Sequence, residues 1–237
     1  MAPPPPPEND GLTHGHPTGP HSAGDGTPPQ DDGGLAHGHP TSRIPAGEQN
    51  PPPARKPLFI IGTGAMARAA LQVAQALDLM VYGFLTPQLE GEEASTEAPE
   101  HLEEVPVLGS LAEHRWQELL QHRQADFFPA VEELETRRAL VKKAFGLDQC
   151  LPVNLIHPSA VVAPDAALQT GILVEPLASI APATELDALC WLGAGVRIGG
   201  GATLGAGVAL RANVVAGPRA HLGEGVFAGA GTIIDAG

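Results

Sequence analysis

The sequence predicts an α/β plus all-β protein: a small parallel α/β domain followed by a parallel β-helix, behind an N-terminal tail. Three observations support this prediction. An aliphatic residue recurs at every sixth position from Val162 to Ile234. Strand-like and helix-like segments alternate over residues 57–153. Residues 1–56 hold most of the proline and almost no aliphatic residues, so they bury too little apolar surface to offset the entropy of ordering, and we expect disorder.

The tail contains a duplicated phrase, GLTHGHPT at Gly11–Thr18 and GLAHGHPT at Gly34–Thr41. Its histidines could form a metal-binding tract. The four candidate ligands are His14, His16, His37 and His39. A duplicated polar segment without a site is the alternative, because no carboxylate or cysteine accompanies the histidines at a fixed spacing.

The α/β domain begins with a buried strand at Leu58–Ile61, a glycine turn and a helix. Further strands are predicted at Leu79–Leu85, Val105–Gly109 and Asp126–Val131, with a helix after the last strand and an acidic surface loop at Glu90–Glu104. Strands that alternate with helices indicate a parallel sheet with Rossmann-like winding. Gly62-x-Gly64-x-x-Ala67 has the form of a dinucleotide fingerprint. No acidic residue closes the second strand, so a tight βα turn without a ligand remains an equal alternative.

The period of six residues predicts the β-helix. Three hexads make one triangular coil of about 18 residues, with large aliphatic residues inside it. The main series is Val162, Leu168, Val174, Ile180, Leu186, Leu192, Ile198, Leu204, Leu210, Ala216, Leu222, Ala228 and Ile234. A second series of small residues runs four positions later, from Ala166 to Thr232. Glycine and asparagine at the corners suit the positive φ of sharp bends. A flexible linker would not keep this phase, and an amphipathic helix has a different period.

Composition excludes several classes of function. The formal net charge of −14 argues against a nucleic-acid or anionic-membrane partner. No apolar run is long enough to span a bilayer, and the start of the chain lacks the regions of a signal peptide, so we expect a cytoplasmic protein. Of the two cysteines, Cys190 falls on an inward position and is predicted to be a small core residue.

The two domains in this order resemble the NeuD/PglD-type sugar O- or N-acyltransferases. The resemblance covers about Pro57 to Gly237 and depends most on NLIHPSAVVAP at Asn154–Pro164, with support from FIIGTGAMA, YGFL, VPVLG and the Arg137 helix after DFFPAV. It implies a left-handed β-helix over residues 154–237, a homotrimer, and acetyl-CoA bound between neighbouring β-helices. It also implies a nucleotide-sugar site at the glycine turn. The candidate residues for that site are Gly62, Gly64, Ala65 and Met66.

The family transfers an acetyl group to a sugar amine or hydroxyl, and a histidine acts as general base. That histidine stands in an E-H-[DE]-C phrase, which falls here on residues 199–202, so its position is Gly200. The second family histidine falls at Ala209. The resemblance therefore assigns no catalytic residue. Its acetyl-CoA groove maps to Gly217, Pro218 and Gly229.

Other family positions also differ. The histidine of the glycine turn is Met66, and the acidic pair after the second strand is Thr86-Pro87. Val131–Leu134 replaces an I-G-[DN]-N phrase and places carboxylates where a nucleotide-sugar phosphate would lie. A family backbone N–H that faces the thioester falls at Pro218, and proline has no N–H.

Two histidines remain in the repeat, His157 and His221. The first corresponds to a structural histidine of the family, and the second has a hexad position that should direct it elsewhere. No zinc site is predicted, because such a site needs three converging histidines. The sequence stops at Gly237 inside a hexad and lacks the family's C-terminal cap, so we expect either a truncated chain or a last coil that is capped by a partner.

Two functions follow from these observations. One is an acetyl-CoA-dependent sugar acetyltransferase that is weakened or inactive because its general base is missing. The other is a non-catalytic β-helical trimer that binds a ligand or organises partners.

Overall fold

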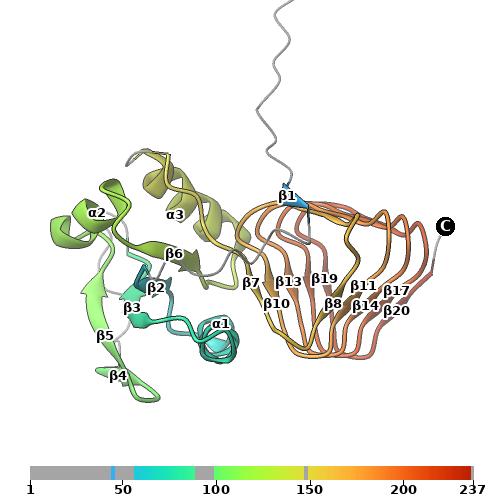
Figure 1. Ribbon diagram of the computed structural model, residues 1–237, viewed down its shortest axis with the longest axis horizontal. Coiled ribbons are helices and arrows are strands. Elements are labelled where there is room, and N and C mark those ends of the chain that lie inside the picture. Colours follow the sequence, from blue (N-terminus) through green and yellow to red (C-terminus); the bar gives the residue numbers. More distant parts are fainter. Residues whose placement is uncertain (1–43, 46–55, 89–98, 147–148, 236–237) are drawn as a thin grey trace, which may run out of the picture. The chain divides into compact units, whose positions relative to one another are not determined.

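The computed structural model describes residues 44–45, 56–88, 99–146 and 149–235 (Figure 1). The four histidines of the duplicated phrase lie outside these residues. Within the described part of the chain, no helix is long and apolar enough to cross a membrane.

The first part contains a five-stranded sheet with the strand order β4-β5-β3-β2-β6. All its pairs are parallel except that of β4 with β5. The strands are β2 (Leu58–Ile61), β3 (Val81–Thr86), β4 (His101–Leu102), β5 (Val105–Ser110) and β6 (Asp126–Pro129). The predicted strands are present, although β4 forms inside the segment expected to be an acidic loop.

Helices cover both faces of this sheet (Figure 1). Helix α1 (Ala65–Ala76) packs in one core with Ile60, Phe84 and Phe128. Helices α2 (His114–Gln121) and α3 (Leu134–Gly146) pack on the opposite face, against the alternate residues of the same strands. The sequence did not predict α2, which is short and polar apart from Trp116, Leu119 and Leu120.

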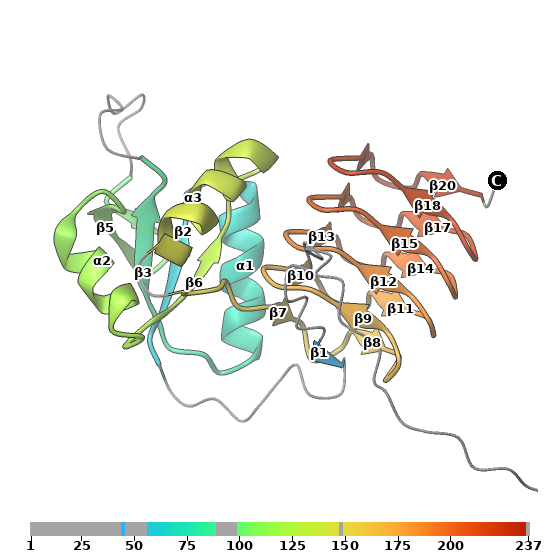
Figure 2. The same ribbon diagram turned by 90° about the horizontal axis from the view of Figure 1, so that it is seen from above.

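The second part is a stack of coils (Figure 2), and each of its strands is two residues long, as in Leu155–Ile156. The strands form three parallel sheets, which we call the first, second and third faces. The first face contains β7 (Leu155–Ile156), β10 (Leu173–Val174), β13 (Trp191–Leu192), β16 (Ala209–Leu210) and β19 (Phe227–Ala228). The second contains β8 (Val161–Val162), β11 (Ser179–Ile180), β14 (Arg197–Ile198), β17 (Val215–Ala216) and β20 (Ile233–Ile234). The third contains β9 (Ala167–Leu168), β12 (Glu185–Leu186), β15 (Thr203–Leu204) and β18 (His221–Leu222).

Each coil is 18 residues long, as the pairing of Leu173 with Trp191 illustrates. This architecture is consistent with the left-handed β-helix implied by the resemblance. Most members of both predicted inward series form one continuous core, and Thr184 is buried as well. Val162, Val226 and Ile234 are only partly buried, and Thr232 is exposed. Cys190 is fully buried in it, and burial raises the pKa of its thiol to about 12. The expectation that Cys190 is a core residue is confirmed.

The corner glycines serve two different purposes. One column of corner residues has positive φ, as at Gly195 (+69°) and Gly201 (+69°), but Leu177 and Arg219 adopt the same conformation there. Gly199, at another position of the hexad, is needed for space: a Cβ there would lie 2.4 Å from the backbone nitrogen of Pro218 in the next coil. The sequence predicted the first requirement and missed the second.

A short strand precedes the α/β part. Strand β1 (Ile44–Pro45) pairs antiparallel with β9 at the edge of the third face. It forms inside the segment that we expected to be disordered.

Candidate functional site

Gly200, where the resemblance predicts the family's general base, lies in a turn between the second and third faces. In the three successive coils this turn has Pro182, Gly200 and Pro218 at the same place. The amide of Gly201 donates to the carbonyl of Pro182 (3.0 Å), and the amide of Arg219 donates to the carbonyl of Gly200 (3.0 Å). No residue of the phrase 199–202 has an ionisable side chain, so this turn offers backbone groups and no base.

Gly199 and Gly200 differ in whether a side chain would fit at their positions. A Cβ on Gly200 would lie 3.3 Å from the carbonyl oxygen of Pro182, and its φ is not positive, so a larger residue needs only a small shift. Gly199 is different, because its Cβ would overlap the backbone of Pro218. A glutamate at the first position of the family phrase therefore does not fit the present coil spacing.

The position of the second family histidine lies on another face. Ala209 is in β16 of the first face, where it pairs with Trp191 on one side and Phe227 on the other. Arg211 extends over this position: its guanidinium carbon is 4.0 Å from the centroid of the Trp191 ring and 5.5 Å from that of Phe227. Within one chain, the structure does not bring Gly200 and Ala209 onto the same face.

Sequence reasoning missed this stack, although its signal was present. Residues 191, 209 and 227 are one coil apart, and residue 211 points to the same side as residue 209 because strand side chains alternate. Trp191 also donates its indole N–H to the Oε1 of Glu175 (2.6 Å). The stack is therefore held by ring contacts and by a hydrogen bond to a carboxylate.

The glycine turn of the α/β part is closely packed. Gly62 has φ +132°, and a Cβ there would lie 2.3 Å from the carbonyl oxygen of Ala130, so only glycine fits. Gly64 caps α1 without a side-chain hydrogen bond and is exposed, as is Ala65. Met66 is fully buried. The four candidate residues thus form one turn in which Gly64 and Ala65 face solvent.

Arg137 of α3 lies beside this turn, and 1% of it is exposed. Its Nη1 donates to the carbonyls of Val131 (2.6 Å) and Glu132 (2.9 Å), and its Nη2 donates to the carbonyl of Gly207 (3.3 Å). The same Nη1 is 3.8 Å from the Sδ of Met66. Burial lowers the pKa of Arg137. The guanidinium nevertheless stays protonated at neutral pH, as arginine does in proteins. Among the residues that the structure describes, its Nε has no hydrogen-bond partner.

Two ion pairs join the beginning of α3 and the loop before it to the β-helix. Arg138 Nη2 is 2.6 Å from the Oε2 of Glu224, and Arg211 Nη2 is 3.3 Å from the Oε2 of Glu132. The hydrogen bond from Arg138 lowers the pKa of Glu224. Leu134 also packs on Gly207, where any Cβ would overlap its methyl groups.

The remaining predicted residues are dispersed. Gly217 and Pro218 share the turn of Gly200, one coil further on, whereas Gly229 is exposed at a different corner, between the first and second faces. His157 Nδ1 accepts the amide hydrogen of Ser159 (3.0 Å), as expected of a structural residue. His221 is exposed on the third face, with its Nδ1 2.6 Å from the Oγ1 of Thr203.

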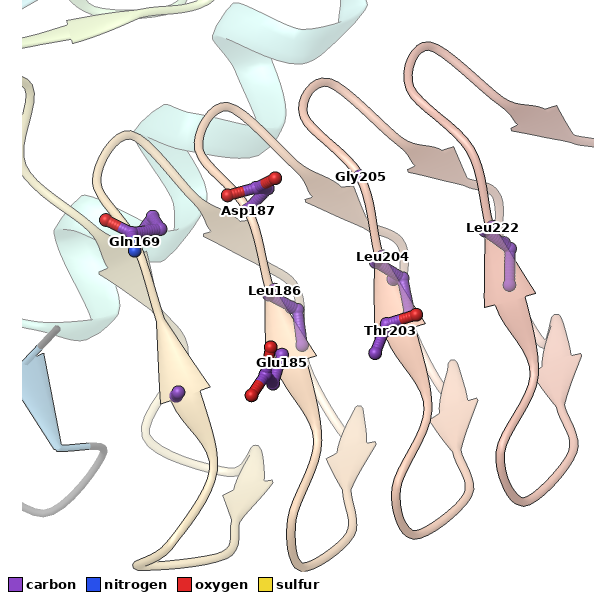
Figure 3. Close-up of a pocket in the computed structure, with 9 residues that line it drawn as sticks. Gln169, Glu185, Leu186, Asp187, Thr203, Leu204, Gly205 and Leu222 are labelled. Atoms are coloured by element: carbon purple, nitrogen blue, oxygen red, sulfur yellow. The ribbon is translucent and has the colours of Figure 1, made fainter. Parts of the chain in front are cut away.

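A polar groove of about 300 Å³ lies on the third face (Figure 3). Its polar side chains are those of Gln169, Glu185, Asp187 and Thr203, and no lysine or arginine lines it. Neither the turn of Gly200 nor Ala209 contributes to it. Among the described residues, no group of three or more histidine, cysteine, aspartate or glutamate side chains could hold a metal ion.

Comparison with known proteins gives structural neighbours. No family model matches the chain, and no curated protein matches it in sequence. A histidine-to-asparagine mutant of perosamine N-acetyltransferase from Caulobacter crescentus, in complex with CoA and GDP-perosamine, superposes with a TM-score of 0.60 at 24% identity, covering 76% of this chain and 89% of that chain. A histidine-to-alanine mutant of GDP-perosamine N-acetyltransferase from the same organism gives the same values. PerB from Caulobacter crescentus, also with CoA and GDP-perosamine, is 29% identical over 78% of this chain and 88% of that chain, with a TM-score of 0.48.

The first two neighbours share the fold of this chain over most of its length, which agrees with the fold that the resemblance implies. The two neighbours that superpose best among those described are therefore perosamine N-acetyltransferases, and this chain shares their fold.

Proposed function

We propose that this protein is an acetyl-CoA-dependent sugar acetyltransferase in which the transfer step is weakened or lost. The structural neighbour with CoA and GDP-perosamine supports the cofactor and the substrate class. The observation that carries the loss is Gly200, which occupies the general-base position with a hydrogen atom as its side chain.

The chemistry explains why this position decides the rate. The acceptor amine or hydroxyl attacks the thioester carbon, a bond from nitrogen or oxygen to carbon forms, the carbon–sulfur bond breaks, and CoA leaves as its thiolate. The acceptor must lose a proton during this attack, and the thiolate must gain one. Removing a positioned general base costs about 10²- to 10⁴-fold in rate.

A non-catalytic, β-helical homotrimer that binds a ligand or serves as a scaffold is the second candidate. The stack of Arg211 over Ala209 favours it, because the space of the second histidine is filled by a guanidinium that also pairs with Glu132. The packing of Gly199 against Pro218 favours it too, since the family phrase no longer fits this turn.

Several further features belong to this proposal. We assign residues 57–153 to a Rossmann-like domain with the nucleotide-sugar site at its glycine turn, and residues 154–237 to the left-handed β-helix. Acetyl-CoA lies along Gly217, Pro218 and Gly229 between neighbouring β-helices of the trimer. The protein is cytoplasmic.

The test is a measurement of CoA release. The purified protein is incubated with acetyl-CoA and a panel of nucleotide amino sugars that includes GDP-perosamine, with the Caulobacter enzyme as a positive control. We expect release that is at least about 10²-fold slower than in the control. Turnover at the rate of the control would refute the loss of activity. Calorimetry with acetyl-CoA measures binding of the cofactor independently of acetyl transfer. Light scattering measures the oligomeric state, and a monomer would refute the trimer.

A further inference from the structure

Arg211 is fixed in place by the faces of two rings. Its guanidinium lies between Trp191 and Phe227, and Ala209 is small enough to leave room for it. Stacking occupies the faces of a guanidinium and leaves its N–H donors, which lie in its plane, available at the edge. The protein therefore holds a permanently charged group in one orientation before any ligand arrives.

A single, replaceable carboxylate occupies that edge. Glu132 Oε2 is 3.3 Å from Arg211 Nη2, which is long for a charge-assisted hydrogen bond. The side chains of Arg211 and Glu132 are 30% and 52% exposed, so solvent weakens their attraction. An anion with more charge could displace this carboxylate at small energetic cost.

Glu132 lies at a place in the sheet where α/β proteins commonly bind ligands. It follows the carboxyl end of β6, which pairs with β2, while the chain after β2 continues on the other side to β3 and β5. In open α/β sheets, ligands bind beside the carboxyl ends of the strands where the strand order reverses.

We propose that Arg211 is an anion-binding residue for the diphosphate of the sugar nucleotide, and that Glu132 holds its place in the ligand-free protein. A diphosphate carries more negative charge than one carboxylate, and its oxygens match the two-pronged edge of a guanidinium. The identity of the anion as a nucleotide-sugar diphosphate rests on the proposed function. The exchange of Glu132 for another anion on Arg211 does not rest on the proposed function, because it requires no acetyl transfer.

The test is calorimetric binding of inorganic pyrophosphate and of GDP-mannose, with guanosine as the probe without phosphate. Glu132→Gln removes the competing carboxylate, and we expect it to raise the affinity for pyrophosphate about three- to tenfold. Glu133→Gln is the matched control: it makes the same change of charge one residue later, at a carboxylate that accepts a hydrogen bond from Thr136 Oγ1 (2.6 Å). We expect it to raise affinity less than twofold, by the weak effect of an exposed charge.

Arg211→Gln should weaken binding of pyrophosphate and GDP-mannose at least about tenfold, and the double variant with Glu132→Gln should bind no better than Arg211→Gln alone. Arg211→Lys keeps the charge, so partial binding in this variant would separate a lost site from a misfolded protein. Equal effects of Glu132→Gln and Glu133→Gln, unchanged binding in Arg211→Gln, or no pyrophosphate binding by any variant would overturn the proposal. Binding of pyrophosphate but not of GDP-mannose would retain the anion site and refute the nucleotide-sugar assignment. Separate calorimetry of the Arg211→Gln variant with acetyl-CoA tests the cofactor of the proposed function in the absence of Arg211.

Discussion

Arg137 should contribute more to stability than any exposed charge of this protein. Its guanidinium, buried to 1% exposure, donates to three carbonyls, two in the loop after β6 and one in the β-helix. Arg137→Met keeps the length of the side chain but leaves these carbonyls without their donor. A stranded buried polar group costs about 1 to 3 kcal/mol, and the methionine recovers part of this by apolar burial. We therefore expect a loss of about 3 to 5 kcal/mol in the free energy of unfolding.

The assay is urea unfolding at fixed protein concentration, followed by circular dichroism for the helices and by the fluorescence of the two tryptophans, Trp116 in the α/β part and Trp191 in the β-helix. Arg138→Met is the matched control, because it removes the same charge one residue later from a solvent-exposed pair with Glu224. It should cause only a small fraction of the loss. The loss in Arg137→Lys should lie between those of the two methionine variants, since one ammonium cannot reproduce the two-pronged contact with the loop carbonyls and with the carbonyl of Gly207. A loss below about 1 kcal/mol in Arg137→Met, or one equal to that of Arg138→Met, would refute this account of Arg137.

Three further predictions use other positions. Gly200→His should raise the rate of CoA release by at least about tenfold, because a base returns to a position with space for it; an unchanged rate would favour the non-catalytic candidate. Cys190, whose thiol pKa is raised to about 12 by burial, should resist iodoacetamide at pH 8 in the native protein, and rapid labelling found by mass spectrometry would contradict its place in the core. The pKa of Glu224 is held below its usual 4.5 by Arg138, so this pair stabilises the fold above pH 4.5 and less as the pH falls through the lowered pKa. Melting temperatures of the wild type should therefore fall more steeply between pH 5 and 3 than those of Glu224→Gln, and parallel curves would show that the pair contributes nothing.

The sequence was most informative where one rule repeats. A period of six assigns the inward residues of every coil, and the core contains those residues. The strands of the α/β part were also identifiable, because buried strands form short apolar runs between turns. Arg137 could not be predicted as buried, since arginine is ordinarily exposed and its acceptors include Gly207, 70 residues further along the chain. The clearance at Gly199 was equally hidden, because it depends on the distance between neighbouring coils and not on the local conformation of its own turn.

The distance between neighbouring coils also limits which residues of the family's catalytic phrase could be introduced by mutation. Neighbouring coils are joined by backbone hydrogen bonds, such as that from the amide of Gly199 to the carbonyl of Ala216 (2.8 Å), so they cannot separate to admit a side chain at residue 199 without losing them. Residue 200 is the next position along, and there the nearest obstacle is a single carbonyl oxygen at 3.3 Å. A histidine is thus compatible with the present backbone, whereas the glutamate that precedes it in the family is not. The activity of Gly200→His should consequently exceed that of a variant with Gly199→Glu added, and the reverse order would show that the coils are more compliant than their hydrogen bonds imply.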